Sequence, residues 1–332
     1  MNQNLLQEKK REFALDLLRV LACFLVIWQH VTEAYYIGPD FTVPTHDEMP
    51  LIGWMNSMTP IEVPLFVMIS GYFLLPLKMD VGAFFKRRFT RILIPFVVWC
   101  VAYSAYFIVY RGDTLAQFLR NVAHIPVNLG VEIGHMWFIY MLLGLYMLVP
   151  IISPWLEQCS KRQLQGYLGV WAFTTLLPYI HLWFPEVWGE CFWNPTPMLH
   201  YFTGFVGYFL LGYYIKRYGA LSVRNALLLL AGGYLFTVAV YQYRLDRVTS
   251  ISDLEICWRF CSMNMMLMTY AMFSLVSRIK WQGNNAFGRW ISSYAMLSYA
   301  VYFVHIMLIN FWRDLLSESL AHVYYQIPII TL

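Results

Sequence analysis

The chain has 332 residues, of which 59% are hydrophobic, 18% aromatic and only 13% charged, and its formal net charge is +4. Because soluble domains carry about a quarter charged residues, this composition excludes an ordinary soluble enzyme and predicts an all-α, polytopic membrane helix bundle. The membrane topology accounts for the positive charge, so we expect no nucleic-acid partner.

Apolar runs along the chain predict nine full spans and a truncated tenth. All of them belong to one integral-membrane domain over residues 12–332, which follows a short cytoplasmic tail at residues 1–11. A last apolar run, residues 327–332, is too short to cross a bilayer and is interpreted as the truncated tenth span. The full spans are expected near residues 12–33, 56–77, 92–110, 134–150, 164–184, 199–215, 225–243, 257–277 and 290–312.

Basic residues are distributed unevenly among the predicted loops. The N-terminal tail and every second loop after it carry 16 Lys and Arg, whereas the other loops carry six. Since loops rich in Lys and Arg stay on the cytoplasmic side, this asymmetry predicts a cytoplasmic N-terminus and a cytoplasmic loop at residues 78–91.

The first span carries ionisable side chains in an otherwise apolar run. At ~100° per residue they fall within an arc of about 100°, and they are Glu12, Asp16, Arg19, His30 and Glu33. Ionisable groups inside a span are costly and usually face a bundle interior or a wet cavity. The stripe therefore predicts a functional face, with interfacial residues at the two membrane surfaces as the alternative.

His30 and Glu33 form the first candidate constellation. Three residues apart on a helix, they are neighbours, and a carboxylate beside a histidine fixes its tautomer and raises its basicity. This is the general-base pattern of acyl transfer to a hydroxyl. The alternative is an ordinary pair at the outer membrane surface.

Four basic residues precede the third span: Lys86, Arg87, Arg88 and Arg91. A guanidinium cluster suits phosphate groups, because each guanidinium makes bidentate, charge-assisted contacts. The alternative is a positive-inside anchor or a lipid headgroup site.

Further candidates lie in the second, fourth and last full spans. The small residues at 70–71 of the second span predict a close approach of two helices. The start of the fourth span gathers Glu132, His135, Trp137 and Tyr140, which belong either to a site or to an aromatic belt. His305 lies deep in the last full span, either as a hydrogen-bonded packing residue or as a functional group.

Several common catalytic patterns are absent from the sequence. It contains no HExxH, no G-x-x-x-x-G-K-[ST], no GxSxG and no GxGxxG motif, which weighs against a metalloprotease, a nucleotide hydrolase, a serine hydrolase and a dinucleotide-binding protein. The six cysteines lie mostly in apolar runs and form no C-x-x-C pair. We therefore expect neither a metal site nor a disulfide framework.

Five motifs are spread over essentially the whole chain. They are LDLLRVLACFLVIWQH, in which Arg19 and His30 form an R-x10-H pattern; VPLFVMISGYFLL, which contains Ser70; the R-x-x-R pair Arg88 and Arg91; HMWFIYMLLGLYMLVP; and ISSYAMLSYAVYFVH, which ends at His305. In these motifs and in their order the chain resembles acyltransferase family 3, a family of integral-membrane acyltransferases.

The resemblance implies a ten-helix bundle that transfers an acyl group, usually acetyl from acetyl-CoA, to a sugar hydroxyl. In this family the histidine of the R-x10-H motif is held to be catalytic, which matches His30. The R-x-x-R pair is associated with the donor, which matches Arg88 and Arg91. The chain departs from the family pattern in its nearly missing tenth helix, and it carries no fused extracellular hydrolase-like domain.

We therefore expect a membrane O-acyltransferase that moves an acetyl group from acyl-CoA to a cell-envelope glycan or a lipid-linked sugar. His30 would deprotonate the acceptor, Glu33 would orient His30, and Arg88 and Arg91 would hold the CoA phosphates. Arg19 would lie on the donor path, since its rise of ~16 Å from His30 is of the order of a pantetheine arm. The remaining candidates are Ser70, Glu132, His135, Trp137, Tyr140 and His305.

The expected partners are acyl-CoA, the sugar acceptor and membrane lipids, with no bound cofactor. The expected location is the cytoplasmic (inner) membrane of a bacterium, with several spans. A transporter or flippase for a small polar or lipid-linked solute is the alternative from another class, and a ligand-binding sensor is a second. Transporters often contain repeated halves, and the sequence shows none.

Overall fold

The computed structural model describes residues 12–127, 133–187, 189–191, 194–281, 283–316 and 322–332. The tail predicted at residues 1–11 lies outside these residues. The chain forms two compact units, unit 1 with Met1–Phe73 and Lys161–Leu332 and unit 2 with Leu74–Ser160. The single membrane domain expected over residues 12–332 stays a prediction.

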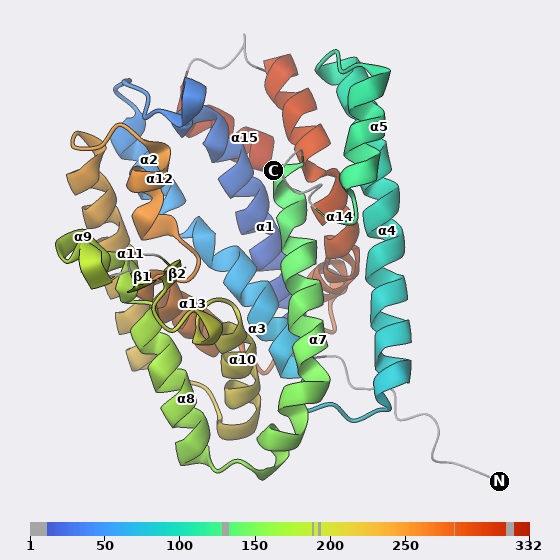
Figure 1. Cartoon of the computed structure of the whole chain (residues 1–332), viewed down its shortest axis with the longest axis vertical. Coiled ribbons are helices and arrows are strands. Elements are labelled where there is room, and N and C mark those ends of the chain that lie inside the picture. The colour runs from blue at the N-terminus through green and yellow to red at the C-terminus, as the bar shows by residue number, and fades with distance from the viewer. Residues whose placement is uncertain (1–11, 128–132, 188, 192–193, 282, 317–321) are drawn as a thin grey trace. The chain divides into compact units, whose positions relative to one another are not determined.

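The N-terminal part of unit 1 begins with one long, uninterrupted helix, α1 (Phe13–Tyr36), drawn in dark blue in Figure 1. After the short 3-10 helix η1 (Pro39–Phe41), a second apolar segment is built from three pieces. They are α2 (Met49–Asn56), the 3-10 helix η2 (Thr59–Ile61) and α3 (Glu62–Leu74). Since a proline is tolerated in the first turn of a helix, Pro60 fits at the start of η2, and Glu62 becomes the first residue of α3.

The C-terminal part of unit 1 contains both long and short helices and one small hairpin. Its elements are α8 (Lys161–Thr174), α9 (Leu177–Trp183), η4 (Pro185–Val187), the antiparallel strands β1 (Gly189–Cys191) and β2 (Asn194–Pro197), η5 (His200–Phe202), α10 (Val206–Tyr218), α11 (Val223–Leu245), α12 (Ile251–Leu254), η6 (Glu255–Trp258), α13 (Met263–Val276), α14 (Ala286–Leu316) and α15 (Val323–Thr331).

Helix α1 is central to the packing of unit 1. It packs along α14 and also contacts α15, η2 and α2, while α11 packs along α13. The last apolar run, expected to be a truncated span, forms the ordered helix α15, whose Ile327 is fully buried. This run therefore contributes to the packing of unit 1.

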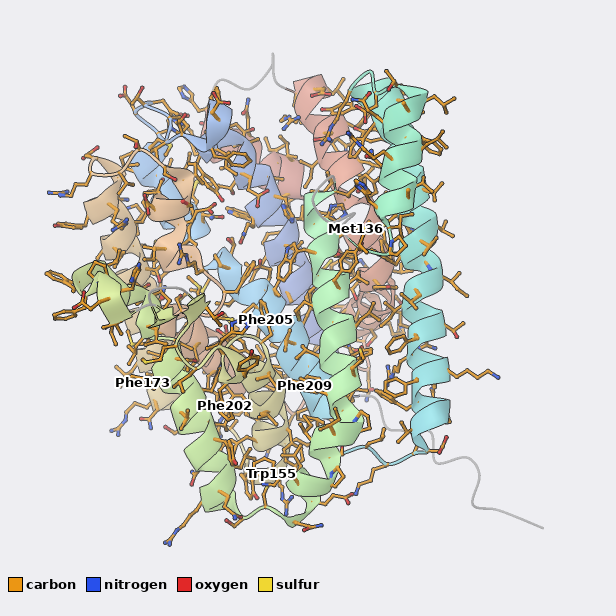
Figure 2. The ribbon with its side chains drawn as sticks, viewed as in Figure 1. Met136, Trp155, Phe173, Phe202, Phe205 and Phe209 are labelled. Carbon is orange, nitrogen blue, oxygen red and sulfur yellow. The ribbon has the colours of Figure 1, made fainter. Side chains whose placement is uncertain are left out.

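Two glycines let α3 and α10 approach closely. A Cβ atom on Gly71 would lie 1.8 Å from the carbonyl oxygen of Phe209, and one on Gly212 would lie 2.0 Å from the carbonyl oxygen of Met68. Phe209 lies on α10 (Figure 2). The close helix approach predicted from the small residues at 70–71 is therefore confirmed.

Unit 2 consists mainly of two long helices, α4 (Val81–Tyr110) and α7 (Trp137–Gln158), with α5 (Leu115–His124) and the 3-10 helix η3 (Gly134–Met136) between them in sequence. Asp80 caps α4 by accepting from the backbone N–H of Ala83. Thr114 and Gln117 form a capping box that starts α5. These caps explain where the two helices begin.

The all-α prediction is confirmed for the described residues, apart from the small β1–β2 hairpin. Among the residues that the structure describes, six segments are long and apolar enough to cross a membrane, namely Phe13–Tyr36, Met49–Leu74, Val81–Tyr110, Gly134–Gln158, Val223–Leu245 and Ala286–Leu316. The runs expected at 164–184, 199–215 and 257–277 instead give broken or shorter helices. For these three runs the expectation of full, unbroken helical spans is wrong.

Candidate functional site

The polar stripe of α1 lies on one continuous helix, and His30 and Glu33 form a hydrogen-bonded pair on it. Nδ1 of His30 lies 2.8 Å from Oε2 of Glu33, and the two side chains are 21% and 32% exposed. Because a carboxylate accepts hydrogen bonds, Nδ1 carries the proton and Nε2 is left as the proton-accepting atom of the neutral ring. The pair therefore has the arrangement that a general base needs.

His305 lies against His30 in unit 1. The two ring centroids are 5.1 Å apart at an interplanar angle of 41°, because α14 packs along α1. His305 is 2% exposed, and its Nδ1 donates to the carbonyl oxygen of Tyr302 at 2.7 Å. The sequence placed this histidine alone in its span, whereas the structure makes it a neighbour of the candidate base.

Arg19 is held by an acidic partner one helical turn away. Its guanidinium donates to Asp16 at 2.8 Å, and the buried Asp16 carboxylate also accepts from the Ser292 hydroxyl of α14 at 3.2 Å. The guanidinium carbon lies 5.0 Å from the centroid of the Phe73 ring. With its side chain 28% exposed, Arg19 is positioned by these contacts, and its role toward a donor stays a prediction.

Other carboxyl groups gather near Glu33. Glu255, in η6, accepts a 2.7 Å hydrogen bond from the Tyr36 hydroxyl at the end of α1. Burial raises the pKa of the Glu255 carboxyl and the charge of Glu33 adds to the rise, while the Tyr36 hydrogen bond and Arg259 oppose it. Glu62 is 3% exposed, and its carboxyl group lies close enough to Glu33 for the charges of the two groups to interact. The sequence reasoning did not assign Glu62 or Glu255 to a site, although a carboxylate within an apolar run signals one.

Ser70 does not contact the His30 pair through any hydrogen bond in the described part of the chain. Its hydroxyl donates to the carbonyl oxygen of Phe66 within α3, at 2.9 Å. A serine bonded to its own helix in this way satisfies its hydroxyl locally, which fits a packing role beside Gly71.

The basic residues expected to bind the donor lie in the first half of α4, in unit 2. Arg88 is half-buried and Arg91 is exposed, and they are three residues apart on the helix, as the R-x-x-R pattern requires. Among the described residues, neither guanidinium has a carboxylate within ion-pair distance. Both are therefore available to an anion, and donor binding by them stays a prediction.

The candidates at the start of the fourth span also lie in unit 2. His135 is buried in η3 with its ring 5.1 Å from that of Tyr103, and Trp137 is the first residue of α7. The Tyr140 hydroxyl donates to the carbonyl oxygen of Ile125 at 2.8 Å. Glu132 lies outside the described residues. His135 and Tyr140 thus contribute to packing between the elements of unit 2.

Comparison with known proteins places these residues in a family. The model of the acyltransferase 3 family, described as an acyltransferase domain, matches residues 12–331. The chain belongs to the acyltransferase 3 family. No curated protein and no solved structure gives a significant match.

Membership of the acyltransferase 3 family makes the protein a membrane-bound acyltransferase. The matched region includes all of unit 2, nearly all of unit 1 and every candidate residue. In the part of the chain that the structure describes, no three His, Cys, Asp or Glu side chains are grouped to hold a metal ion. The chemistry that the described side chains can perform is proton transfer by imidazole and carboxylate groups and anion binding by guanidinium groups.

Proposed function

We propose that the protein is an O-acetyltransferase that moves an acetyl group from acetyl-CoA to a hydroxyl of a cell-envelope glycan or its lipid-linked precursor. The observation that carries this proposal is the 2.8 Å hydrogen bond between His30 and Glu33, in a chain of the acyltransferase 3 family. The five motifs resemble those of the O-acetyltransferase of enterobacterial common antigen, and this resemblance supports acetyl as the transferred group and an envelope glycan as the acceptor.

In the proposed reaction, Nε2 of His30 removes the proton of the acceptor hydroxyl while Nδ1–H stays bonded to Glu33. The acceptor oxygen attacks the thioester carbonyl, the carbon–sulfur bond breaks, and the thiolate of CoA takes the proton from His30. Glu33 stabilises the imidazolium that forms in between. Arg88 and Arg91 bind the donor phosphates, because a guanidinium matches phosphate geometry.

The proposed location is the cytoplasmic membrane of a bacterium, with the N-terminus in the cytoplasm. The charge asymmetry of the loops supports this orientation. CoA esters are cytoplasmic metabolites, so a cytoplasmic position of the α3–α4 connection places the basic start of α4 on the side where the donor is found.

Replacement of His30 tests the proposal. A positioned general base contributes roughly 10²–10⁴-fold, so His30→Ala and His30→Gln should both lower the acetylation rate by about this factor. Glutamine keeps a hydrogen-bonding side chain but does not take up a proton at neutral pH. The measurement is the initial rate of label transfer from radiolabelled acetyl-CoA to extracted envelope glycan, at matched membrane abundance.

His46→Gln is the matched control, because this histidine is exposed and its Nε2 lies 2.9 Å from the backbone oxygen of Tyr35, away from the His30–Glu33 pair in sequence. Its rate should equal that of the wild type. A near-normal acetylation rate for His30→Gln together with no detectable acetylation by His305→Ala would indicate that the general base is His305, on α14. Solute counterflow without label on glycan would instead support a transporter.

A further inference from the structure

Two buried polar side chains near the His30–Glu33 pair carry atoms that lack hydrogen-bond partners. Glu62 is 3% exposed and Asn56 is fully buried. Among the described residues, Oε2 of Glu62 and Nδ2 of Asn56 have no hydrogen-bond partner. Since the great majority of buried polar atoms in native proteins are paired, each of these two atoms calls for an explanation.

A second buried asparagine shows that unit 1 can satisfy such a group fully. Asn264 is 1% exposed, and its Nδ2 donates to the Thr237 hydroxyl and to the carbonyl oxygen of Cys257, both at 2.7 Å. Its Oδ1 lies 2.7 Å from the hydroxyls of Tyr179 and Ser262. Asn264 is thus a structural amide with every polar atom paired, whereas the Nδ2 group of Asn56 has no such partner among the described residues.

Asn56 and Glu62 belong to one polar row. Asn56, Thr59 and Glu62 are spaced three residues apart, and the Thr59 hydroxyl lies 2.8 Å from Oδ1 of Asn56. Thr59 begins η2 and the backbone N–H of Glu62 donates to the carbonyl oxygen of Thr59. Because side chains at i and i+3 eclipse in a 3-10 helix, Thr59 and Glu62 project to the same side.

The row faces α1 beside the candidate base. Helix α1 packs against η2, and the Thr59 hydroxyl lies 3.2 Å from Oε1 of Gln29, the residue before His30. Glu62 is within electrostatic range of Glu33, which holds His30. The unpartnered oxygen and nitrogen therefore lie in the same region of unit 1 as the proposed proton acceptor.

The two unpartnered atoms define the chemistry of a ligand. A carboxylate oxygen accepts and an amide nitrogen donates, so together they suit a group that does both, as a hydroxyl does. The donating amide in the same polar row disfavours a bare cation, and the carboxylate disfavours an anion. Vicinal hydroxyls of a sugar ring fit this pair best.

We propose that Asn56 and Glu62 form an acceptor subsite that binds sugar hydroxyls beside His30. The proposal rests on the acetyltransferase function proposed above and assigns its acceptor side to the α2–η2–α3 segment. These two residues act as positioning residues, because they hold the sugar while His30 takes the proton of the reacting hydroxyl.

The test separates the affinity for the acceptor from the affinity for the donor. Initial acetylation rates are measured with base-treated, de-O-acetylated envelope glycan and with acetyl-CoA, each varied in turn. Loss of a hydrogen bond to a charged or buried group lowers affinity roughly ten-fold or more. Glu62→Leu and Asn56→Leu should therefore raise the apparent KM for glycan by about this factor and leave the KM for acetyl-CoA unchanged.

Two further variants control for folding. Glu62→Gln keeps an accepting oxygen and should recover part of the affinity that Glu62→Leu loses. Glu48→Gln changes a carboxylate whose oxygens are already held by His322 at 3.1 Å and by the backbone of Val323 at 3.3 Å, and its KM for glycan should equal that of the wild type. An unchanged KM for glycan in both leucine variants would overturn the proposal, and so would an equal rise for both substrates.

A binding measurement distinguishes failure of the subsite from failure of the proposed function. The same glycan is added to purified protein in a detergent without a sugar headgroup, and the thermal midpoint is recorded. Stabilisation of the wild type but not of Glu62→Leu supports the subsite, even if no acetyl transfer is detected. Without acetyl transfer, this result would contradict the proposed acetyltransferase function alone. Equal stabilisation of both proteins, or of neither, overturns the subsite.

Discussion

His30 and His305 show how one residue type takes different roles through its partner. Both rings use Nδ1 as a donor, but His30 donates to a carboxylate and His305 to a backbone carbonyl. A carboxylate carries a full negative charge and stabilises an imidazolium more than a neutral carbonyl does. The partner therefore favours His30 as the proton acceptor of the two adjacent rings.

The buried Glu255 carboxyl gives a testable dependence of stability on pH. Its folded-state pKa is raised, chiefly by burial, above the ordinary value of 4.5. Such a group favours folding while it is protonated, so its contribution is present below pH 4.5 and is lost as the pH rises through the folded pKa. Glu255→Gln keeps an oxygen for the Tyr36 hydroxyl and does not ionise.

We therefore expect the thermal midpoint of purified Glu255→Gln to match the wild type below the ordinary pKa and to exceed it near neutral pH. Glu186→Gln provides the control for removing a carboxylate, and because Glu186 is exposed, this variant should match the wild type near neutral pH. A Glu255→Gln difference that is constant with pH would contradict the assignment.

At the scale of elements, the sequence predicted helices well where an apolar run continued without a break. It predicted them poorly where the backbone conformation at a glycine or a proline interrupted the run. Helix α1 follows its apolar run closely, and the contact between His30 and Glu33 follows from their spacing on it. The run at 199–215 is broken because Gly204 has φ +78°, outside the helical region, so that α10 begins only at Val206. The run at 164–184 is broken before Pro178, in the first turn of α9.

Contacts between distant segments were beyond the reach of sequence patterns. The 5.1 Å approach of His305 to His30 depends on the packing of α14 along α1. No hydrophobic period or motif in the sequence encodes this packing. The polar row of Asn56 and Glu62 also depends on a 3-10 turn after α2, because a continuous helix would place these residues differently. Motif recognition supplied His30 as the candidate base, and the tertiary structure supplied the residues around it.

The close crossing of α3 and α10 predicts a sharp difference between two glycines. Gly71→Ala places a Cβ atom against the backbone of Phe209, where no flexible side chain can give way. Overpacking of this kind costs about 1–3 kcal/mol or more, so the thermal midpoint of the purified protein should fall.

The matched control is Gly232→Ala, because a Cβ atom added to this exposed glycine inside α11 would have no neighbouring atom within 4 Å. Alanine favours a helix over glycine by about 1 kcal/mol, so this variant should be as stable as the wild type or more stable. Equal effects of the two substitutions would show that the α3–α10 crossing is looser than the structure indicates.

At the scale of the whole molecule, the proposed mechanism depends on which side of the membrane each end of α1 faces. His30 and Glu33 lie toward the C-terminal end of α1, and Arg19 lies toward its N-terminal end. A cytoplasmic N-terminus therefore places the candidate base nearer the outer surface, where an envelope glycan is reached. The opposite orientation would place the base nearer the cytoplasm.

The first two apolar segments are sufficient to test this orientation. Phe13–Tyr36 and Met49–Leu74 are both long and apolar enough to cross the membrane. The exposed residue Asp47 follows the first segment, and the exposed residue Lys78 follows the second.

With 16 Lys and Arg in one set of loops and six in the other, we expect Lys78 in the cytoplasm and Asp47 outside. An impermeant thiol reagent should label Asp47→Cys in intact cells and Lys78→Cys only after the membrane is opened. Wild-type protein measures the background from the native cysteines, of which Cys23, Cys100, Cys159 and Cys257 are buried and Cys261 is half-buried. The reverse labelling pattern would place the α3–α4 connection outside, where it meets no CoA ester, and would remove Arg88 and Arg91 from the proposed donor site.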